Sequence, residues 1–369
     1  MSQSTVPTQT VPTRVSVELP TTMGLDLSDK HGQFHVQRGD GRRLAVGKVS
    51  LTRDALTKLF TQWSGCRLVI EASCQSAWIG LLAQQCAMEL VVANPRHVEL
   101  LTKSDNKTDE TDAELLTEIG RTNPKLLGPV THRSMETQEH LAILRARDEL
   151  VRNRTMLVNH VRGVLKTHGV RVPSMSPECF GRRVLDSIPS QLTAALQPLV
   201  RVIETVNREI KGCDKTLVSL GEEHYPIVKL LQQIGGVGPL VSLAFVLIIA
   251  DPKRFKSSRD VAAYLGLVPR KQSSGKKDPQ LRITKAGDRN VRRLLVLAAN
   301  YILGRFGPDC DLRRFGMKIV GEGTDKIAKK KARVAVARKL AVLMHHLWRT
   351  GEEYDPFYLA KKRGEPLAA

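Results

Sequence analysis

Apolar and polar residues alternate in three short runs within TMGLDLSDKHGQFHVQRGDGRRLAVGKV, which begins at Thr22. A period of two is typical of β-strands that bury one face, and the stretches SDKHG and RGDGR between the runs are turn signals. The pattern therefore predicts an antiparallel meander of three strands.

Strands and helices then alternate along the chain. A helical pattern from about 52 to 63 precedes CRLVIEAS, a strand that ends at Glu71, and a second helical pattern near 75 to 89 precedes the apolar run ELVVANP. Strands that alternate with helices after a meander are typical of an α/β domain with a mixed sheet. We expect this domain to occupy residues 22–130, after a loose tail at 1–21 that is rich in Ser, Thr, Pro and Gln.

Apolar residues at seven-residue spacing predict a helical middle region at 131–222, with long helices at about 132–167 and 190–220. Two rows mark the first helix: Leu144, Val151, Val158 and Leu165, and beside them Leu150, Leu157 and Val164. The second helix has the alternating four and three spacing of a coiled coil, at Leu192, Leu196, Leu199, Ile203, Val206, Ile210, Cys213 and Leu217. A hairpin that packs only on itself and a coiled coil that dimerises the chain both fit this pattern. Pro198 either kinks the second helix or marks its true start.

The remaining segment, 223–350, has a predominantly helical pattern and is strongly basic, and residues 351–369 form a second tail. Between Lys253 and Arg293 there are 13 Lys and Arg against three acids, and Lys326–Lys339 adds seven basic residues and no acid. Two such runs in one domain favour a surface that follows the phosphates of a nucleic acid.

The composition of the whole chain supports this interpretation. It carries 57 Lys and Arg against 37 Asp and Glu, a formal net charge of +20, which points to a polyanionic partner. No apolar run reaches the length of a membrane span and no amino-terminal signal pattern is present, so nucleic acid is expected rather than a membrane. The six cysteines show no CxxC pair and no His at zinc-like spacing, which is typical of reduced thiols in a cytoplasmic protein.

Four acids stand out against the basic background. Asp109 and Asp112 lie one turn apart at the start of a predicted helix, where the helix dipole favours acids but like charges repel by about a few tenths of a kcal/mol. Asp26 lies among apolar residues in the first predicted strand, where an unpaired acid is costly. Glu71 ends another strand, at the edge where α/β folds place their sites. Together the four acids fit a two-metal centre for phosphoryl transfer.

The order of GLDLSD, VIEAS and NKTDETDAELL resembles the RuvC-like (RNase H-like) amino-terminal domain of the DEDD insertion-sequence transposases, the insertion-sequence-110 family with its 1111 branch. The resemblance implies a Mg²⁺-binding tetrad made of Asp26, Glu71, Asp109 and Asp112. The stretch EASCQSAW departs from the family, which usually has a Gly and an aromatic residue after the acid. The departure concerns the pocket beside Glu71 rather than Glu71 itself.

A glycine turn lies in LQQIGGVGPLVSLAF, from Gly236 to Gly238. Its Gly-hydrophobic-Gly core is that of a helix-hairpin-helix, in which glycines let backbone N–H groups approach a phosphate next to a helix amino terminus. An ordinary connection between two helices has the same pattern, so both interpretations stay open at this point.

The stretch LGLVPRKQSSGKKDPQLRITKAGDRNVRRLL resembles the carboxy-terminal transposase domain of the same family, with GLVPR, SG, ITKAG and RRLL in order. In that family the Ser of the SG pair attacks a DNA phosphate, which implies Ser274 as the nucleophile and Ser273 as its near competitor. Without the resemblance, SSG would be interpreted as a flexible turn. The cations expected to bind nucleic acid around it are Arg270, Lys271, Lys276, Lys277, Lys285, Arg292 and Arg293.

These resemblances imply a DNA transposase of a bacterial insertion sequence, located in the cytoplasm on the nucleoid. They imply cleavage of element ends and target DNA through a transient phosphoserine, a dimer or tetramer of the chain, and a structured noncoding RNA as guide. One alternative is a metal-dependent resolvase of Holliday-type junctions, which would use the same acids without Ser274. Another is an inactivated relative that only binds DNA or RNA, which the four intact acids argue against.

Overall fold

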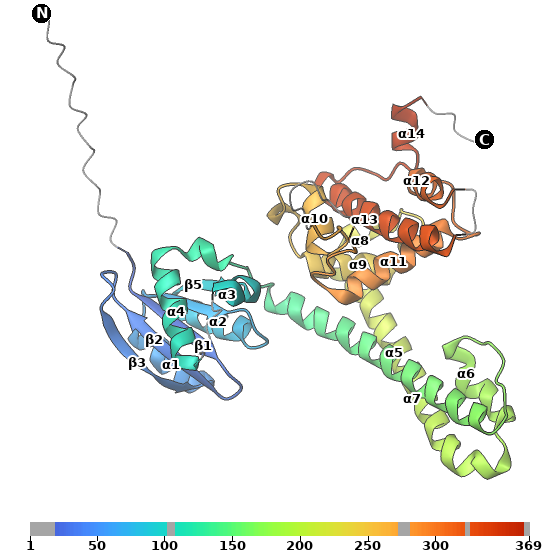
Figure 1. Cartoon of the computed structure of the whole chain (residues 1–369), viewed down its shortest axis with the longest axis horizontal. Coiled ribbons are helices and arrows are strands. Elements are labelled where there is room, and N and C mark those ends of the chain that lie inside the picture. The colour runs from blue at the N-terminus through green and yellow to red at the C-terminus, as the bar shows by residue number, and fades with distance from the viewer. Residues whose placement is uncertain (1–18, 102–107, 272–280, 322–324, 365–369) are drawn as a thin grey trace, which may run out of the picture. The chain divides into compact units, whose positions relative to one another are not determined.

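The computed structural model describes residues 19–101, 108–271, 281–321 and 325–364. The chain forms two compact units, Met1–Ser134 and Met135–Ala369 (Figure 1). None of the described helices is both long and apolar enough to cross a membrane.

The first unit is built on a five-stranded sheet with the order β3-β2-β1-β4-β5. Pairing is antiparallel between β1 and β2 and between β2 and β3, and parallel between β1 and β4 and between β4 and β5. The predicted meander and mixed sheet are therefore confirmed. The strands are β1 (Thr22–Leu27), β2 (His31–Gln37), β3 (Arg43–Ser50), β4 (Arg67–Glu71) and β5 (Glu89–Ala93).

Helices cover both faces of this sheet. Leu68 and Ile70 of β4 share a core with α1 and α2, whereas Val69 between them packs with Leu116 of α4. The alternation of strand side chains thus separates two apolar cores, as expected for a strand buried on both faces. The helices are α1 (Arg53–Gln62), α2 (Ser76–Gln85), α3 (Pro95–Leu101) and α4 (Asp109–Thr122), followed by a short 3-10 turn, η1 (Pro124–Leu127).

The second unit begins with a long antiparallel pair of helices, α5 (Met135–Thr167) and α7 (Thr193–His224), which pack side by side (Figure 1). Between them lies α6 (Pro177–Val184), whose Phe180 is buried against both helices. The two long helices agree with the predicted segments. Pro198 lies inside α7, near its beginning.

The buried seam of α7 differs from the predicted one at every second position. Leu196, Ile203, Ile210 and Leu217 are buried as expected. The positions between them are filled by Val200 and Asn207, while Leu199, Val206 and Cys213 are only partly buried. The sequence pattern assigned the seam to apolar residues, whereas the structure uses a polar residue at Asn207.

Polar residues also form a row on α5, at seven-residue spacing, which faces α7. His140 Nδ1 lies 2.8 Å from Tyr225 Oη, Arg147 Nε donates to Asp214 Oδ1 at 2.6 Å, and Arg154 Nη1 donates to Asn207 Oδ1 at 3.0 Å. Each hydrogen bond forms only when its α5 residue lies directly opposite its partner in or just after α7. The row therefore fixes the register of the two helices. The polar row was not predicted, because the helices were assigned from the spacing of apolar residues alone.

The carboxy-terminal helices pack around α9, whose residues from Ser242 to Ile249 are all buried. Their core continues into the hairpin through Leu141, Leu144 and Leu217. The helices are α8 (Ile227–Leu231), α9 (Pro239–Ile249), α10 (Ser258–Tyr264), α11 (Arg289–Leu303), α12 (Asp311–Val320), α13 (Lys326–Thr350) and α14 (Tyr358–Lys362), with a 3-10 turn at η4 (Pro252–Arg254). Two further 3-10 turns, η2 (Leu185–Ser187) and η3 (Ser190–Leu192), lie between α6 and α7.

Candidate functional site

Asp26 lies near the carboxyl end of β1, half-buried, opposite Gln33 of β2. Burial first, and then the negative charges of Asp109, Asp112 and Glu71 in that order, together raise the pKa of the Asp26 carboxyl from 3.8 to about 6. These acids come from two strands and a helix. The structure therefore brings Asp109, Asp112 and Glu71 close enough to Asp26 to act on its carboxyl electrostatically.

Glu71 is the last residue of β4, next to Ala93 of β5. Because β1 and β4 are parallel neighbours, their carboxyl ends meet at one edge of the sheet, which places Glu71 and Asp26 at the same edge. Beyond Glu71 the chain turns tightly into α2, where Ser73 N donates to Ser76 Oγ at 2.9 Å. Here the chain differs from the family pattern of a Gly and an aromatic residue.

Asp109 and Asp112 occupy the first turn of α4, as predicted. Thr108 caps this helix: Thr111 N donates to Thr108 Oγ1 at 3.2 Å and Thr108 N donates to Thr111 Oγ1 at 3.0 Å. The cap fixes where the helix begins. The helix dipole favours the acids in this turn, yet their charge also raises the pKa of Asp26. Asp109 is exposed and Asp112 is half-buried.

The backbone of α4 lies unusually close to β1 because glycine occupies position 24. A Cβ atom on Gly24 would come within 2.3 Å of the carbonyl oxygen of Ala113. Gly24 N instead donates to Thr117 Oγ1 at 2.9 Å, and the same hydroxyl lies 3.0 Å from the carbonyl oxygen of His35 in β2. Thr117 thus ties α4 to both strands and holds its first turn beside Asp26.

Three polar side chains around this edge were not predicted from the sequence. Gln75 Nε2 donates to the carbonyl oxygens of Ser28 and Asp29 at 3.1 and 3.0 Å, which joins the turns after β1 and β4. In β2, Gln33 Oε1 and both ring nitrogens of His35 are buried without a hydrogen-bond partner among the described residues. Burial lowers the pKa of His35. The sequence could not predict where these side chains lie, because their positions depend on which segments of the chain pair with each other.

The second predicted site lies in unit two, and its central residues, Ser273, Ser274, Gly275, Lys276 and Lys277, fall outside the described residues. The described flanks of that segment meet. Arg270 N donates to the carbonyl oxygen of Arg282 and Thr284 N donates to that of Val268, both at 2.9 Å. We call these flanks, Val268–Arg270 and Arg282–Thr284, the stem.

Two of the predicted nucleic-acid-binding cations make contacts within the protein. Arg292 Nη1 donates to the carbonyl oxygens of Leu265 and Ala286, at 3.0 and 2.6 Å, and burial lowers the pKa of its guanidinium. Arg293 pairs with Asp148 of α5. Arg292 therefore buttresses the chain beside the stem, and Arg293 joins α11 to the hairpin.

The remaining predicted cations near the stem face solvent: Arg270, Lys271 and Lys285 are exposed. Lys285 has a positive φ of 57°, a conformation that costs energy for a residue with a Cβ. Its N–H donates to the carbonyl oxygen of Gly266 at 3.1 Å, which holds this turn in place.

The predicted glycine turn connects α8 to α9. Gly236 has a φ of +90°, and a Cβ there would lie 3.0 Å from Tyr301 Cδ1 of α11, so glycine serves both conformation and packing. Gly238 precedes the first residue of α9, and a Cβ there would meet no atom within 4 Å. The turn thus leaves open space at Gly238, beside the amino terminus of a helix.

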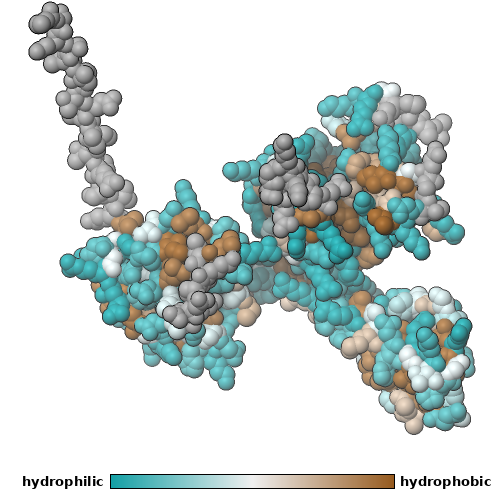
Figure 2. All heavy atoms as spheres, viewed as in Figure 1, coloured by the Kyte–Doolittle hydropathy of each residue, from teal (hydrophilic) through white to brown (hydrophobic). Residues whose placement is uncertain are grey.

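A cavity of about 1370 Å³ lies beside the stem, and its wall includes Pro269 and Ile283. Apolar side chains such as Phe315 line it together with cations of α13 such as Lys331 and Arg338. Figure 2 shows apolar surface bordered by hydrophilic surface over the carboxy-terminal helices. Cations next to apolar surface suit a ligand with both phosphates and flat bases.

Two family models match the chain. The model of the IS116/IS110/IS902 transposase family matches residues 228–313, and the DEDD transposase model of IS110 matches residues 23–169. The first matched segment contains the glycine turn and the stem. The second contains the four acids and all of α5.

Transposases of named insertion sequences are similar to most of the chain. The transposase of IS1111A from Coxiella burnetii is 30% identical over 268 residues, which cover 71% of this chain and 71% of that protein. The transposase of IS1328 from Yersinia enterocolitica is 28% identical over 295 residues, which cover 77% of this chain and 84% of that protein. The similarity thus extends across both units.

Proposed function

The chain belongs to the IS116/IS110/IS902 family of insertion-sequence transposases, and we propose that it cuts and rejoins DNA strands with a serine nucleophile and a magnesium site. The family membership makes it a DNA-transposing enzyme. The proposed nucleophile is Ser274. The proposed metal ligands are Asp26, Glu71, Asp109 and Asp112.

The effect of three carboxylates on a fourth carries the proposal, because the charges of Asp109, Asp112 and Glu71 add to burial in raising the pKa of Asp26. The parallel pairing of β1 with β4, which carry Asp26 and Glu71, supports a shared site at one edge of the sheet. Carboxylate oxygens are preferred ligands of Mg²⁺, and paired cations stabilise the attacking and leaving oxygens of a phosphoryl transfer. A bound cation would also offset the repulsion among the acids.

In the proposed reaction Ser274 Oγ attacks a DNA phosphorus atom. An Oγ–P bond forms as the serine hydroxyl loses its proton, one P–O bond of the strand breaks, and the released DNA oxygen takes up a proton and becomes a hydroxyl. A hydroxyl of a second strand then attacks the phosphoserine, which restores a DNA P–O bond and frees the serine. The stem supports this role, since its backbone hydrogen bonds hold together the two ends of the segment that carries Ser274.

The proposed partners are DNA, both element ends and target, and a structured guide RNA. The net charge of +20 and the cavity beside the stem, with its α13 cations, support a nucleic-acid partner. The guide RNA and the location on the bacterial nucleoid rest on the family alone, whereas the homo-oligomer is also supported by the seven-residue spacing of the hairpin helices. The open space at Gly238 supports a phosphate contact of the helix-hairpin-helix kind.

Trapping of the covalent intermediate tests the proposal. The full chain is incubated with labelled element-end DNA, the element's noncoding RNA and Mg²⁺, then denatured and digested, and the DNA-linked peptide is identified by mass spectrometry. We expect the adduct on Ser274. Ser274→Ala should remove it and Ser273→Ala should retain it, because the neighbouring hydroxyl cannot meet the same in-line geometry.

A further inference from the structure

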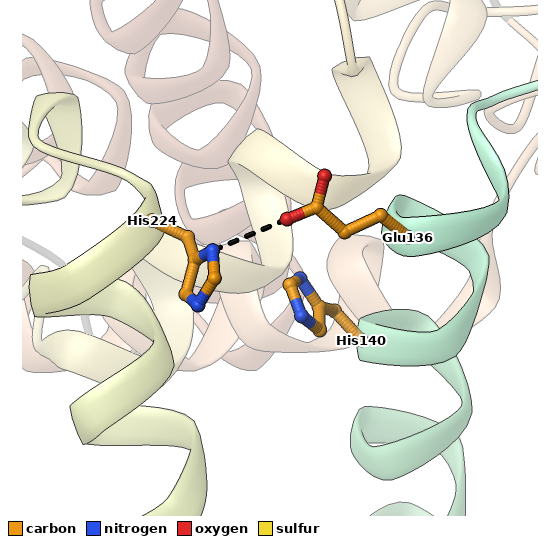
Figure 3. A group of neighbouring side chains, drawn as sticks. All are labelled: Glu136, His140 and His224. Atoms are coloured by element: carbon orange, nitrogen blue, oxygen red, sulfur yellow. Dashed lines mark ion pairs between the residues drawn. The ribbon is translucent and has the colours of Figure 1, made fainter.

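A second group of metal-ligating side chains lies apart from the four acids, on the hairpin. Glu136 and His140 share a face of α5 at four-residue spacing, and His224 is the last residue of α7. One ligand atom from each lies within 4.8 Å of the other two, and Figure 3 shows the three side chains converging between the helices.

The distances suit a small divalent ion. Bonds of about 2.0–2.1 Å in tetrahedral geometry place neighbouring ligand atoms roughly 3.4 Å apart. Glu136 Oε1 and His224 Nδ1 are already 3.1 Å apart. Small side-chain rotations would bring the third ligand atom to the same spacing, and Glu136 and His224 are both exposed and able to rotate.

His140 is the fixed member of the group, with 8% of its surface exposed. Its Nδ1 lies 2.8 Å from Tyr225 Oη, and the two rings meet edge to face. Thr137 is also hydrogen-bonded to the Tyr225 hydroxyl. The Tyr225 contact occupies Nδ1 and leaves Nε2. The second nitrogen of a metal-binding histidine characteristically hydrogen-bonds to a carboxylate, a backbone carbonyl or water, which sets the orientation of the ring. Here the Tyr225 hydroxyl takes that place.

We propose that Glu136, His140 and His224 bind one Zn²⁺ ion, with water as a fourth ligand. Two imidazoles and one carboxylate form a ligand set typical of zinc, whereas Mg²⁺ prefers oxygen ligands alone. The ion joins the beginning of α5 to the end of α7, and its ligand His140 is also the first residue of the polar row. It therefore clamps the open end of the hairpin where the chain turns into α8.

Metal binding is measured on the full-length chain after removal of metals with a chelator. Titration with Zn²⁺ should give one tight site per chain and raise the melting temperature, because the ion binds the folded hairpin. Glu136→Gln and His224→Ala should each weaken Zn²⁺ binding at least about tenfold, the loss seen even for outer partners of metal sites. Both side chains are exposed, and circular dichroism checks that the variants fold.

Matched variants separate this site from the proposed active site and from the cysteines. His160→Ala, an exposed histidine of α5, and Asp109→Asn should both keep full Zn²⁺ binding. Co²⁺ in place of Zn²⁺ should give the visible bands of a tetrahedral ion without thiolate charge-transfer bands. The proposal is overturned by no binding in the unaltered chain, by unchanged binding in His224→Ala, by loss in Asp109→Asn, or by thiolate bands.

Discussion

Asp26 carries a carboxylate at a position that the fold alone does not favour. Burial and three neighbouring acids make its charged form costly, which raises its pKa to about 6. Proteins keep such groups where activity requires them, at the expense of stability. Asp26 is thus the residue at which the proposed function and the stability of the first unit conflict.

Asp26→Asn should stabilise the metal-free protein. In a chelator we expect its melting temperature to rise by roughly 4 °C, the shift that about 1 kcal/mol gives in a domain of this size once solvent screening of a half-buried group is allowed for. The reason is that the variant no longer buries a charge and no longer experiences repulsion by Asp109, Asp112 and Glu71. Strand cleavage should be lost in the same variant. Differential scanning calorimetry and a cleavage assay measure the two effects.

The pH dependence of this difference is specific. The folded chain holds the Asp26 proton more tightly than the unfolded chain, with a pKa of about 6 against 3.8. This group therefore contributes stability below pH 3.8, and the contribution is lost as pH rises through about 6. The advantage of Asp26→Asn should grow between these values and level off above them. Glu99→Gln, an exposed acid, should show no such trend, and a lower melting temperature for Asp26→Asn at pH 7 would contradict the account.

Sequence reasoning found the four acids because each stands out locally, within a strand, at a strand end or in a first helical turn. It did not find Gln75 or Thr117, whose contacts depend on residues far away in the chain, or Gln33, whose place opposite Asp26 depends on strand register. Gly24 N and Thr117 Oγ1, for example, are 93 positions apart. The Glu136, His140 and His224 group was missed for the same reason, since its members come from opposite ends of the hairpin.

At the level of elements, one hydroxyl positions α4. Thr117→Val should lower the stability of the first unit by about 1–3 kcal/mol, because Gly24 N is left buried without its acceptor. Strand cleavage should fall as well, since α4 carries Asp109 and Asp112. Urea unfolding and cleavage rates measure both. Thr117→Ser keeps the hydroxyl and should retain most of the activity, and equal losses in the two variants would refute a role for the hydrogen bond.

The polar row of the hairpin makes a separate prediction. Arg154 is buried and donates to Asn207 Oδ1, and its other terminal nitrogen lies 3.0 Å from Glu178 Oε1. Asn207→Leu should cost about 1–3 kcal/mol by leaving Arg154 short of a partner. The double variant Arg154→Leu with Asn207→Leu should recover much of this stability, since two apolar groups can replace a buried polar pair. Additive losses in the urea-unfolding cycle would count against coupling.

The helices of the hairpin were predicted from seven-residue spacing, but half of the α7 seam was not. The alternating four and three spacing allows two seams, one through Leu199 and Val206 and one through the residues that follow each of them. The prediction chose Leu199 and Val206 because both are apolar. The structure buries Val200 and Asn207 instead. Asn207 faces Arg154, so a polar contact rather than hydrophobicity selects the seam.

For the whole molecule, the sequence predicted a basic nucleic-acid-binding protein with a mixed-sheet domain followed by helices. Charge and the alternation of apolar and polar residues are local properties of the sequence, so both can be recognised without knowledge of the fold. The cavity beside the stem could not be predicted, because it combines α12, α13 and the stem. Its cations were visible in the sequence only as a charge run.

Dimerisation through the hairpin stays a prediction at this scale. The seam described above is used within one chain, but apolar side chains such as Met156 and Val202 remain exposed on its outer surface, at 62% and 48%. Analytical ultracentrifugation with and without nucleic acid should show a dimer or tetramer. Met156→Glu with Val202→Glu should shift the chain toward monomer, whereas a strict monomer of the unaltered chain under every condition would exclude the oligomer.

The identity of the nucleophile is the central claim, and cleavage rates of two variants in Mg²⁺ test it most directly. We expect Ser274→Ala and Asp109→Asn both to abolish cleavage of element-end DNA, the first by removing the nucleophile and the second by removing a metal ligand, with nucleic-acid binding retained in both. If Ser274→Ala cuts at the normal rate while Asp109→Asn does not, water is the nucleophile, and a metal-dependent resolvase replaces the serine mechanism.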